Sequence, residues 1–158
     1  MSFDYADYAK QISNMSSGVY NRNRFRQGTY KFELTRCVLK QSRNGAPMIA
    51  IEGTVKDVLR STDENNSVGE SVSYVNVQNK FPHYFMRDQL AIAAAVLGVS
   101  PAALKADTDQ MVEALQAVFP EEGGAKSVAV GREIQVNHTE YTKDDGTTKT
   151  TTYFDAAR

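Results

Sequence analysis

Between Tyr20 and Gly45 the sequence YNRNRFRQGTYKFELTRCVLKQSRNG interleaves basic and aromatic side chains in a pattern that could bind a polyanion. It contains seven lysines and arginines but only one acid, Glu33. Single-stranded nucleic acid offers a phosphate and a flat base at every nucleotide, and proteins bind it with cationic grooves and exposed rings. A net charge of +6 in these 26 residues, against −1 for the whole chain, leaves −7 on the other 132. The pattern therefore predicts one localised basic surface on an acidic body.

The sequence contains no recognisable catalytic or metal-binding motif. His83 and His138 are some 55 residues apart, and neither shares a motif with Cys37. Phosphate-binding loops, nucleophile elbows and paired-cysteine spacings do not occur. A cysteine within a predicted strand is expected to be a buried apolar residue rather than a nucleophile. Asp144 and Asp145 precede a glycine, which is typical of a hairpin turn rather than a metal site. We therefore expect a protein that is not an enzyme and uses no cofactor.

The predicted elements follow the order strand, strand, strand, helices, strand, strand. Alternation of apolar and polar residues with period two indicates strands. An Asn-Gly dipeptide between the first two strands is typical of a hairpin. The first strand is expected from Gly28, with a bulge at 36–39, the second over 48–59 and the third over 71–79. A helical insert at about 82–119 follows, and the last two strands form a C-terminal hairpin. This order predicts a mainly β fold, namely a five-stranded Greek-key barrel of the oligonucleotide/oligosaccharide-binding (OB) type.

One domain is expected, because 158 residues suffice for a single core. The OB-like domain would cover residues 28–158, and residues 1–27 would form a flexible arm because they carry little apolar surface. No apolar run reaches the length of a membrane span, and the first residues, MSFDYADYAK, do not resemble a signal peptide. With a single cysteine, the composition favours a cytoplasmic location and no membrane partner.

The OB arrangement assigns roles to the basic and aromatic residues, because the face of strands two and three and the adjacent loops line its groove. Phosphates are expected on Arg22, Arg24, Arg26, Lys31, Lys40, Arg43, Lys56, Arg60 and Arg87, and bases on Tyr20, Phe25, Tyr30 or Tyr74. Phe32 is expected in the core, because it alternates with polar residues. Tyr30 is compatible with either place. Tyr20 and Phe25 lie in a segment without periodicity, which favours exposure.

Two stretches, GTYKFELTRCVLKQSRNGAPMIAIEGTV and GESVSYVNVQNKFPHYFMRDQLAIAAAVLG, resemble small OB-fold single-stranded-DNA-binding proteins of tailed bacteriophages. The resemblance covers roughly residues 28–98. It implies a protein that coats single-stranded DNA largely without sequence preference during phage DNA replication and recombination, in the cytoplasm of the host. Replication or recombination proteins are the implied partners. Many such proteins end in an acidic tail that recruits partners, whereas this chain ends in TTTYFDAAR; the acidic FDYADY near the start is a candidate substitute.

Other functions remain open at this point. An OB-like barrel could serve only as a scaffold, for a phage structural part or an inhibitor of a host enzyme, with the arginines binding an acidic protein surface. The sequence does not distinguish DNA from RNA, because the 2′-hydroxyl makes that difference. It does not fix the oligomeric state, so a homo-oligomer is compatible with it.

Overall fold

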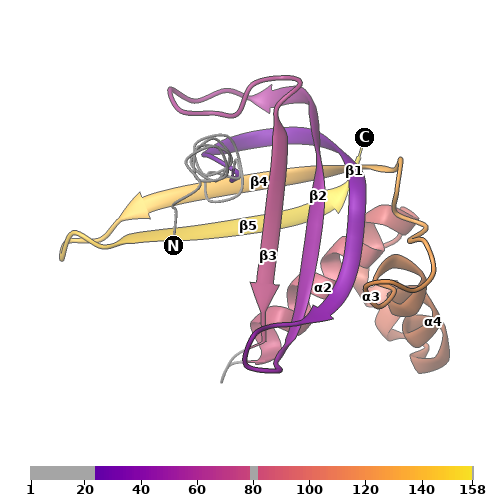
Figure 1. The fold of residues 1–158 in the computed structure, drawn as a ribbon. Helices are drawn as coiled ribbons and strands as arrows, with labels where there is room; N and C mark the ends of the chain where they lie inside the picture. The colour runs from indigo at the N-terminus through magenta and orange to yellow at the C-terminus, as the bar shows by residue number, and fades with distance from the viewer. Residues whose placement is uncertain (1–23, 79–81, 158) are drawn as a thin grey trace, which may run out of the picture.

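The computed structural model describes residues 24–78 and 82–157 and is organised around a five-stranded antiparallel sheet with the order β3-β2-β1-β4-β5 (Figure 1). Helices α2, α3 and α4 lie between β3 and β4 along the chain, where the helical insert was predicted. The bounds are β1 Gly28–Gln41, β2 Pro47–Arg60, β3 Ser71–Val77, α2 Pro82–Leu97, α3 Pro101–Lys105, α4 Thr108–Val118, β4 Glu133–Thr142 and β5 Thr148–Ala156. The predicted mainly β fold with a helical insert is confirmed.

The bent strand β1 connects the two halves of the sheet. Residues Thr29 to Glu33 pair with both β2 and β4, whereas the later residues of β1 pair with β2 and with no other described strand. The register with β2 shifts three times, the last shift lying between Leu34 and Arg36. Such bulges bend a strand and increase its twist. Figure 1 shows the result, because β1 runs beside β4 at first and then curves down beside β2, with β3 on the far side of β2.

The sheet is not closed into a barrel by hydrogen bonds. In the described chain β3 and β5 are the two edge strands, and neither pairs with the other. The gap between them is filled by side chains: the ring of Tyr74 in β3 lies 5.2 Å, centroid to centroid, from the ring of Phe154 in β5. Helix α2 packs mainly against β5 and buries its alanine-rich face. The closed barrel expected from the sequence is therefore not observed.

The core lies inside the curved sheet and consists of alternate residues of its strands. Tyr30, Phe32 and Leu34 of β1 are fully buried, so the core position predicted for Phe32 is confirmed. Cys37 is also buried, and burial raises the pKa of its thiol to about 12. A thiol with so high a pKa is not a thiolate at neutral pH and is a poor nucleophile. Of the helices in the described residues, none is both long and apolar enough to cross a membrane.

Candidate nucleic-acid interface

The segment that precedes β1 is fixed to the loop between β2 and β3. The side chain of Asn66, which is 0% exposed, accepts a hydrogen bond from the Arg26 N–H at 2.8 Å and donates to the Arg24 carbonyl at 3.0 Å. It also donates to the Glu70 carboxylate at 2.7 Å. The Tyr30 hydroxyl donates to the Arg26 carbonyl and accepts from the Asn66 N–H. These contacts hold the backbone before β1 against the β2–β3 loop. We call Asn66 with its partners Arg24, Arg26, Tyr30 and Glu70 the arm latch.

Three of the rings expected to stack on bases are used inside the fold. Phe25 is 4% exposed, and its ring lies 5.0 Å from that of Phe32, so its predicted exposure is wrong. Tyr30 is 0% exposed and has no face for a base. Tyr74 packs on Phe154 and its hydroxyl donates to the carboxylate of Asp88.

Phe25 is buried because its ring fills the core beside the start of β1, although no periodic pattern in the sequence surrounds it. The predicted arm, which extends to residue 27, therefore includes residues that belong to the fold. Tyr20 and Arg22 lie outside the described residues, and their assignments stay predictions.

Four of the nine predicted phosphate-binding cations meet carboxylates that come from distant parts of the described chain. The pairs are Arg26 with Glu70 at 3.0 Å, Lys31 with Glu133 at 3.8 Å, Lys40 with Glu122 at 3.9 Å and Lys56 with Glu33 at 3.9 Å. The positive charge that is concentrated in the sequence is thus largely offset on the folded surface. The three lysine pairs are long and solvent-accessible, and such pairs contribute little stability, so a phosphate can compete for these lysines. Arg24 and Arg43 are exposed, without a carboxylate partner among the described residues.

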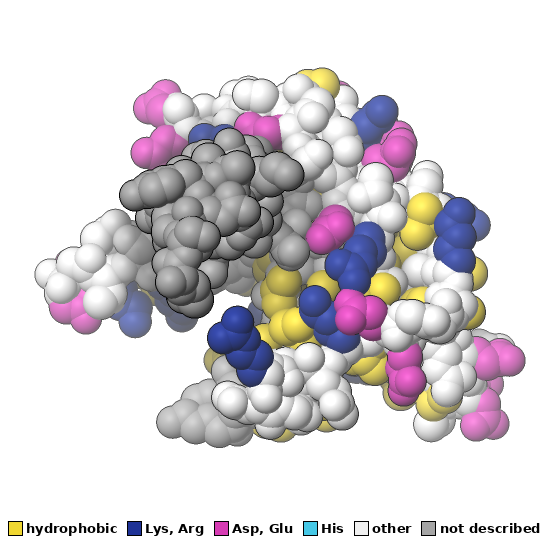
Figure 2. Space-filling view, in the orientation of Figure 1, with side chains coloured by type: hydrophobic (Ala, Val, Ile, Leu, Met, Phe, Trp, Pro, Cys, Tyr) yellow, Lys and Arg dark blue, Asp and Glu magenta, His cyan; other side chains and the backbone are white. Residues whose placement is uncertain are grey.

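The outer face of β1, β2 and β3 is the surface on which the OB arrangement predicts a groove. Its register places Val38, Ala50 and Val75 in one row, and Val75 is 44% exposed. Figure 2 shows hydrophobic side chains on this side of the molecule with lysines, arginines and acids around them. No aromatic residue occupies an outer position of these strands over their described residues. This face offers cations and apolar contacts but no ring on which a base could stack.

Exposed rings and a cation come together where α2 meets β5. The guanidinium carbon of Arg87 lies 5.4 Å from the ring centroid of Tyr84 and 5.9 Å from that of Tyr153. The two tyrosines are 51% and 54% exposed. Arg87 also lies 3.7 Å from Asp88, a buried carboxylate that accepts from Asn76 at 2.8 Å. We call Tyr84, Arg87 and Tyr153 the tyrosine–arginine cluster.

The sequence predicts Arg87 as a phosphate-binding residue, but it predicts neither Tyr84 nor Tyr153 as a ring on which a base stacks. Tyr84 lies three positions before it in α2, a spacing that places both side chains on one helix face and could have indicated the pair. Tyr153 has no comparable signal, because the adjacent Phe154 could equally face outward. Only the register of β4 with β5 places Tyr153 outside and Phe154 inside.

A row of cross-strand partners extends from this cluster to the end of β2. Tyr153 is opposite Asn137 of β4, Asn137 is opposite Thr29 of β1, and Thr29 is opposite Arg60. Arg60 donates from Nε to Thr29 Oγ1 and from Nη2 to Asn137 Oδ1, both at 3.3 Å. Thr29 Oγ1 donates to Asn137 Oδ1 at 3.1 Å. We call these four residues the cross-strand row. It brings Arg60, a predicted site residue, onto the same surface as Arg87.

Buried His138, on the core side of β4, makes the fold sensitive to acid. Its ring nitrogens lie 2.8 Å from Thr152 Oγ1 and 3.2 Å from the Glu140 carboxylate. Burial lowers the pKa of His138, as does the charge of Arg24, while Glu140 acts in the opposite direction.

An unfolded histidine, with a pKa of about 6.5, then takes up a proton before the native one does. We expect the contribution of neutral His138 to the free energy of unfolding to be fully present above about pH 6.5. It should fall as the pH decreases from there to the lower native pKa of His138, by at most about 1.4 kcal/mol per pH unit. Urea unfolding of wild type and His138→Gln at several pH values measures this. His83→Gln is the control and should keep the dependence. An unchanged dependence in His138→Gln would show that His138 is not its source.

Comparisons with known proteins assign no family to this chain. No protein family matches it, and no curated protein is similar to it. The tyrosine–arginine cluster and the cross-strand row are therefore the observations from which a function can be argued.

Proposed function

We propose that the protein binds single-stranded DNA, largely without sequence preference, on the surface of the tyrosine–arginine cluster. The observation that carries the proposal is the position of Arg87 between two half-exposed rings. Each base has a flat face that can stack on tyrosine, at about 1–3 kcal/mol per base, and the phosphate between two bases needs a cation nearby. Tyr153 and Tyr84, whose ring also lies 4.2 Å from that of His83, provide the aromatic rings, and Arg87 provides the cation.

The arrangement of the strands supports the proposal. The order β3-β2-β1-β4-β5 is the one that an OB barrel has when it is opened between β3 and β5. We propose that the fold is a partly open barrel of this type, which commonly binds oligonucleotides. From the resemblance over residues 28–98 we also propose a role in phage DNA replication or recombination, in the cytoplasm of the host and with proteins of those processes as partners. Arg24, Arg43 and the weakly paired lysines would add phosphate contacts at the margins.

Fluorescence polarisation with labelled oligo-dT tests the proposal. Wild type is expected to bind, and its affinity should fall with salt by a log–log slope of about −0.7 for each phosphate neutralised. Tyr84→Ala combined with Tyr153→Ala should weaken binding at least tenfold, since two stacking rings are lost at about 1–3 kcal/mol each. Tyr141→Ala is the matched control, because Tyr141 is also 54% exposed but lies near the tip of the β4–β5 hairpin.

The outcomes separate the hypotheses. No binding at low salt, or equal affinity for duplex and single strand, would overturn the proposed function. Full binding by the double tyrosine variant would overturn the assignment of the site. A matched ribo-oligonucleotide shows whether RNA is bound as well, since only the 2′-hydroxyl and base methylation differ.

The edge strand β3 favours a second candidate function, as a protein-interaction module. Its sequence SVSYVNV carries no charge and no proline, the devices that usually protect an edge from pairing. Val75 and Val77, two residues of this strand, are 44% and 38% exposed. A partner could add an extended segment to this edge. Failure of oligonucleotide binding, together with a partner interaction that Val75→Lys abolishes, would favour this function.

A further inference from the structure

We infer that the cross-strand row is a phosphodiester subsite in which Arg60 binds the phosphate, so that a bound single strand crosses β5, β4 and β1 toward the end of β2. The inference rests on the proposed function, because it takes the tyrosine–arginine cluster as the place where bases stack. It adds a second contact point, a direction for the bound strand, and a positioning role for Asn137 and Thr29.

Arg60 is held in place by neutral groups rather than by a carboxylate. Its two hydrogen-bond partners among the described residues, Thr29 Oγ1 and Asn137 Oδ1, are neutral acceptors. By contrast, Arg26, Arg36 and Arg87 each have a carboxylate within 4 Å. A guanidinium has five N–H donors in a fixed fork, and two bonds leave three of them for a ligand. An exposed arginine that is oriented by neutral groups is preorganised for a phosphate, because binding costs neither an ion pair nor much side-chain entropy.

Asn137 connects the two ends of the row. Its Oδ1 accepts from Arg60 and from Thr29, so both hydrogen bonds depend on one amide oxygen. This arrangement orients the amide nitrogen of Asn137 away from Arg60, where it can donate to a phosphate or a base. Asn137 is also the direct cross-strand neighbour of Tyr153. Asn137 and Thr29 are therefore positioning residues that fix the guanidinium at a set distance from the stacking ring.

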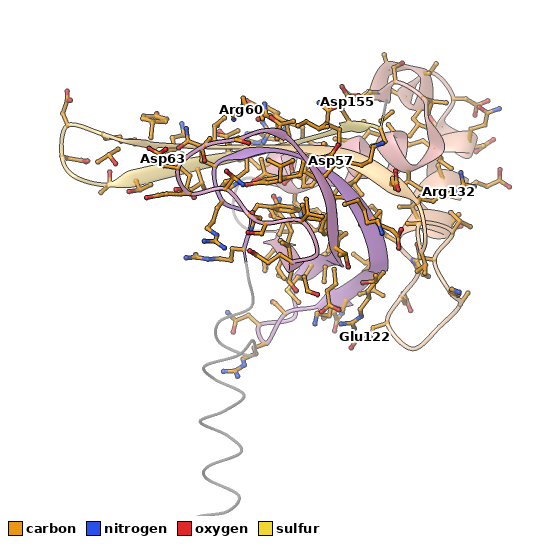
Figure 3. All side chains as sticks on the ribbon, turned by 90° about the horizontal axis from the view of Figure 1, so that it is seen from above. Asp57, Arg60, Asp63, Glu122, Arg132 and Asp155 are labelled. Carbon is orange, nitrogen blue, oxygen red and sulfur yellow. The ribbon has the colours of Figure 1, made fainter. Side chains whose placement is uncertain are left out.

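The charges beside the row restrict the path of a polyanion. The adjacent row, in register, runs from Asp155 through Gln135 and Lys31 to Asp57, with an acid at each end. Figure 3 shows Arg60 and Asp155 along the same side of the molecule, with Glu122 on the opposite side. A phosphate chain is repelled by Asp155 and Asp57 and attracted by Arg60. The lowest-energy path from Tyr153 therefore leads along the cross-strand row to Arg60.

The number of phosphates in the ligand gives the inference its test. Three gaps between neighbouring strands, of about 4.8 Å each, separate the backbones of Tyr153 and Arg60, but the Arg60 guanidinium reaches back to Asn137, one gap from Tyr153. A thymidine dinucleotide has a single phosphate between its two bases, so with both bases stacked on the tyrosine–arginine cluster it leaves no phosphate for Arg60, whereas a longer oligonucleotide does. Arg60 should therefore contribute to the affinity for long oligo-dT and not to that for a thymidine dinucleotide.

The experiment measures binding of wild type, Arg60→Ala and Asn137→Ala to labelled oligo-dT of graded length over a range of salt. For long oligo-dT we expect Arg60→Ala to weaken binding about tenfold and to reduce the salt slope by about 0.7. Asn137→Ala should weaken it severalfold, and its effect should largely vanish in the Arg60→Ala background, because it acts through Arg60. Arg132→Ala is the control, since it removes the same charge from an exposed position off the row. Thr29→Val, which removes the hydroxyl that bonds to Arg60 and Asn137, is a second probe of the same contacts. Thermal unfolding of each variant detects one that fails to fold.

Failure of the inference and failure of the proposed function give different results. If wild type binds no oligo-dT, the proposed function fails and the inference with it. If wild type binds and folded Arg60→Ala keeps the full affinity and slope, the inference alone is wrong. An equal loss of affinity for short and long oligonucleotides in Arg60→Ala would overturn the crosswise path. Full additivity of the effects of Asn137→Ala and Arg60→Ala would overturn the positioning role of Asn137.

Discussion

Replacing Asn66 by alanine is expected to lower the free energy of unfolding by about 3 kcal/mol and to release the segment before β1. The change removes three hydrogen bonds and leaves the Arg26 N–H and the Arg24 carbonyl without partners. A fully buried polar group that loses its partner costs about 1–3 kcal/mol, and these two groups are only partly buried, so each costs toward the lower end of that range. Glu70 responds as well: burial raises its pKa, but hydrogen bonds from Asn66, the Ser67 N–H and Arg26 outweigh this and hold the pKa below its usual value. The loss of Asn66 removes one of them.

Urea unfolding and limited trypsin digestion measure the two effects. Asn66→Ala should be cut at Arg24 and Arg26 much faster than wild type, because the arm latch no longer holds that backbone. Ser67→Ala is the control, since Ser67 is exposed and its side chain makes no hydrogen bond within the described part of the chain. A loss below about 1 kcal/mol with unchanged cleavage would show that Phe25 alone, through its burial in the core, fixes the segment.

The parts of the fold that the sequence predicts correctly are those determined by local patterns. Alternation identifies the buried face of β1, because every second side chain of a strand lies on the same side. The helix α2 begins at Pro82 and is followed by Gly98, whose φ of 70° suits a residue without a β-carbon. These signals extend over a few residues and do not depend on the rest of the chain.

The predicted binding site is less accurate because it depends on which distant segments meet. Lys31 and Lys40 belong to a basic stretch of the sequence, but β4 and the segment after α4 bring Glu133 and Glu122 to them. Phe25 has no periodic neighbours, yet it fills the core next to Tyr30. A linear charge pattern cannot reveal acids that arrive from about 80 to 100 residues further along the chain. Arg60 and Arg87, in contrast, were identified as cations, and only the register of four strands shows that one surface connects them.

The closure of the barrel is also a long-range property. The order of five strands follows from the order of patterns along the chain, but hydrogen bonding between β3 and β5 requires their backbones to approach. Tyr74 and Phe154 occupy that seam with their rings. Two aromatic side chains between the edges keep the sheet curved and packed without pairing its ends.

Replacing Gly53 by alanine is expected to destabilise the protein by about 3 kcal/mol or more. An added β-carbon would lie 2.2 Å from the Glu33 carbonyl oxygen and 2.6 Å from Cζ of Phe32. Overpacking in a core typically costs about 1–3 kcal/mol, and here one of the atoms is backbone and cannot rotate away. Thr54→Ala, one position along on the outer face, should lose less than about 1 kcal/mol in the same urea titration. Equal stability of the two variants would mean that β1 can move away from β2 at little cost.

Gly53 also connects the fold to the proposed site. It is opposite Leu34, next to the last register shift of β1, where the strand bends between its two sets of partners. A displacement at this point would change how the first half of β1 meets β4, and hence the distance between Thr29 and Asn137. We therefore expect any folded Gly53→Ala protein to lose affinity for long oligo-dT as Arg60→Ala does, while short oligonucleotides on the tyrosine–arginine cluster bind as before. Normal affinity for long oligo-dT in a destabilised Gly53→Ala protein would separate the bend in β1 from the binding surface.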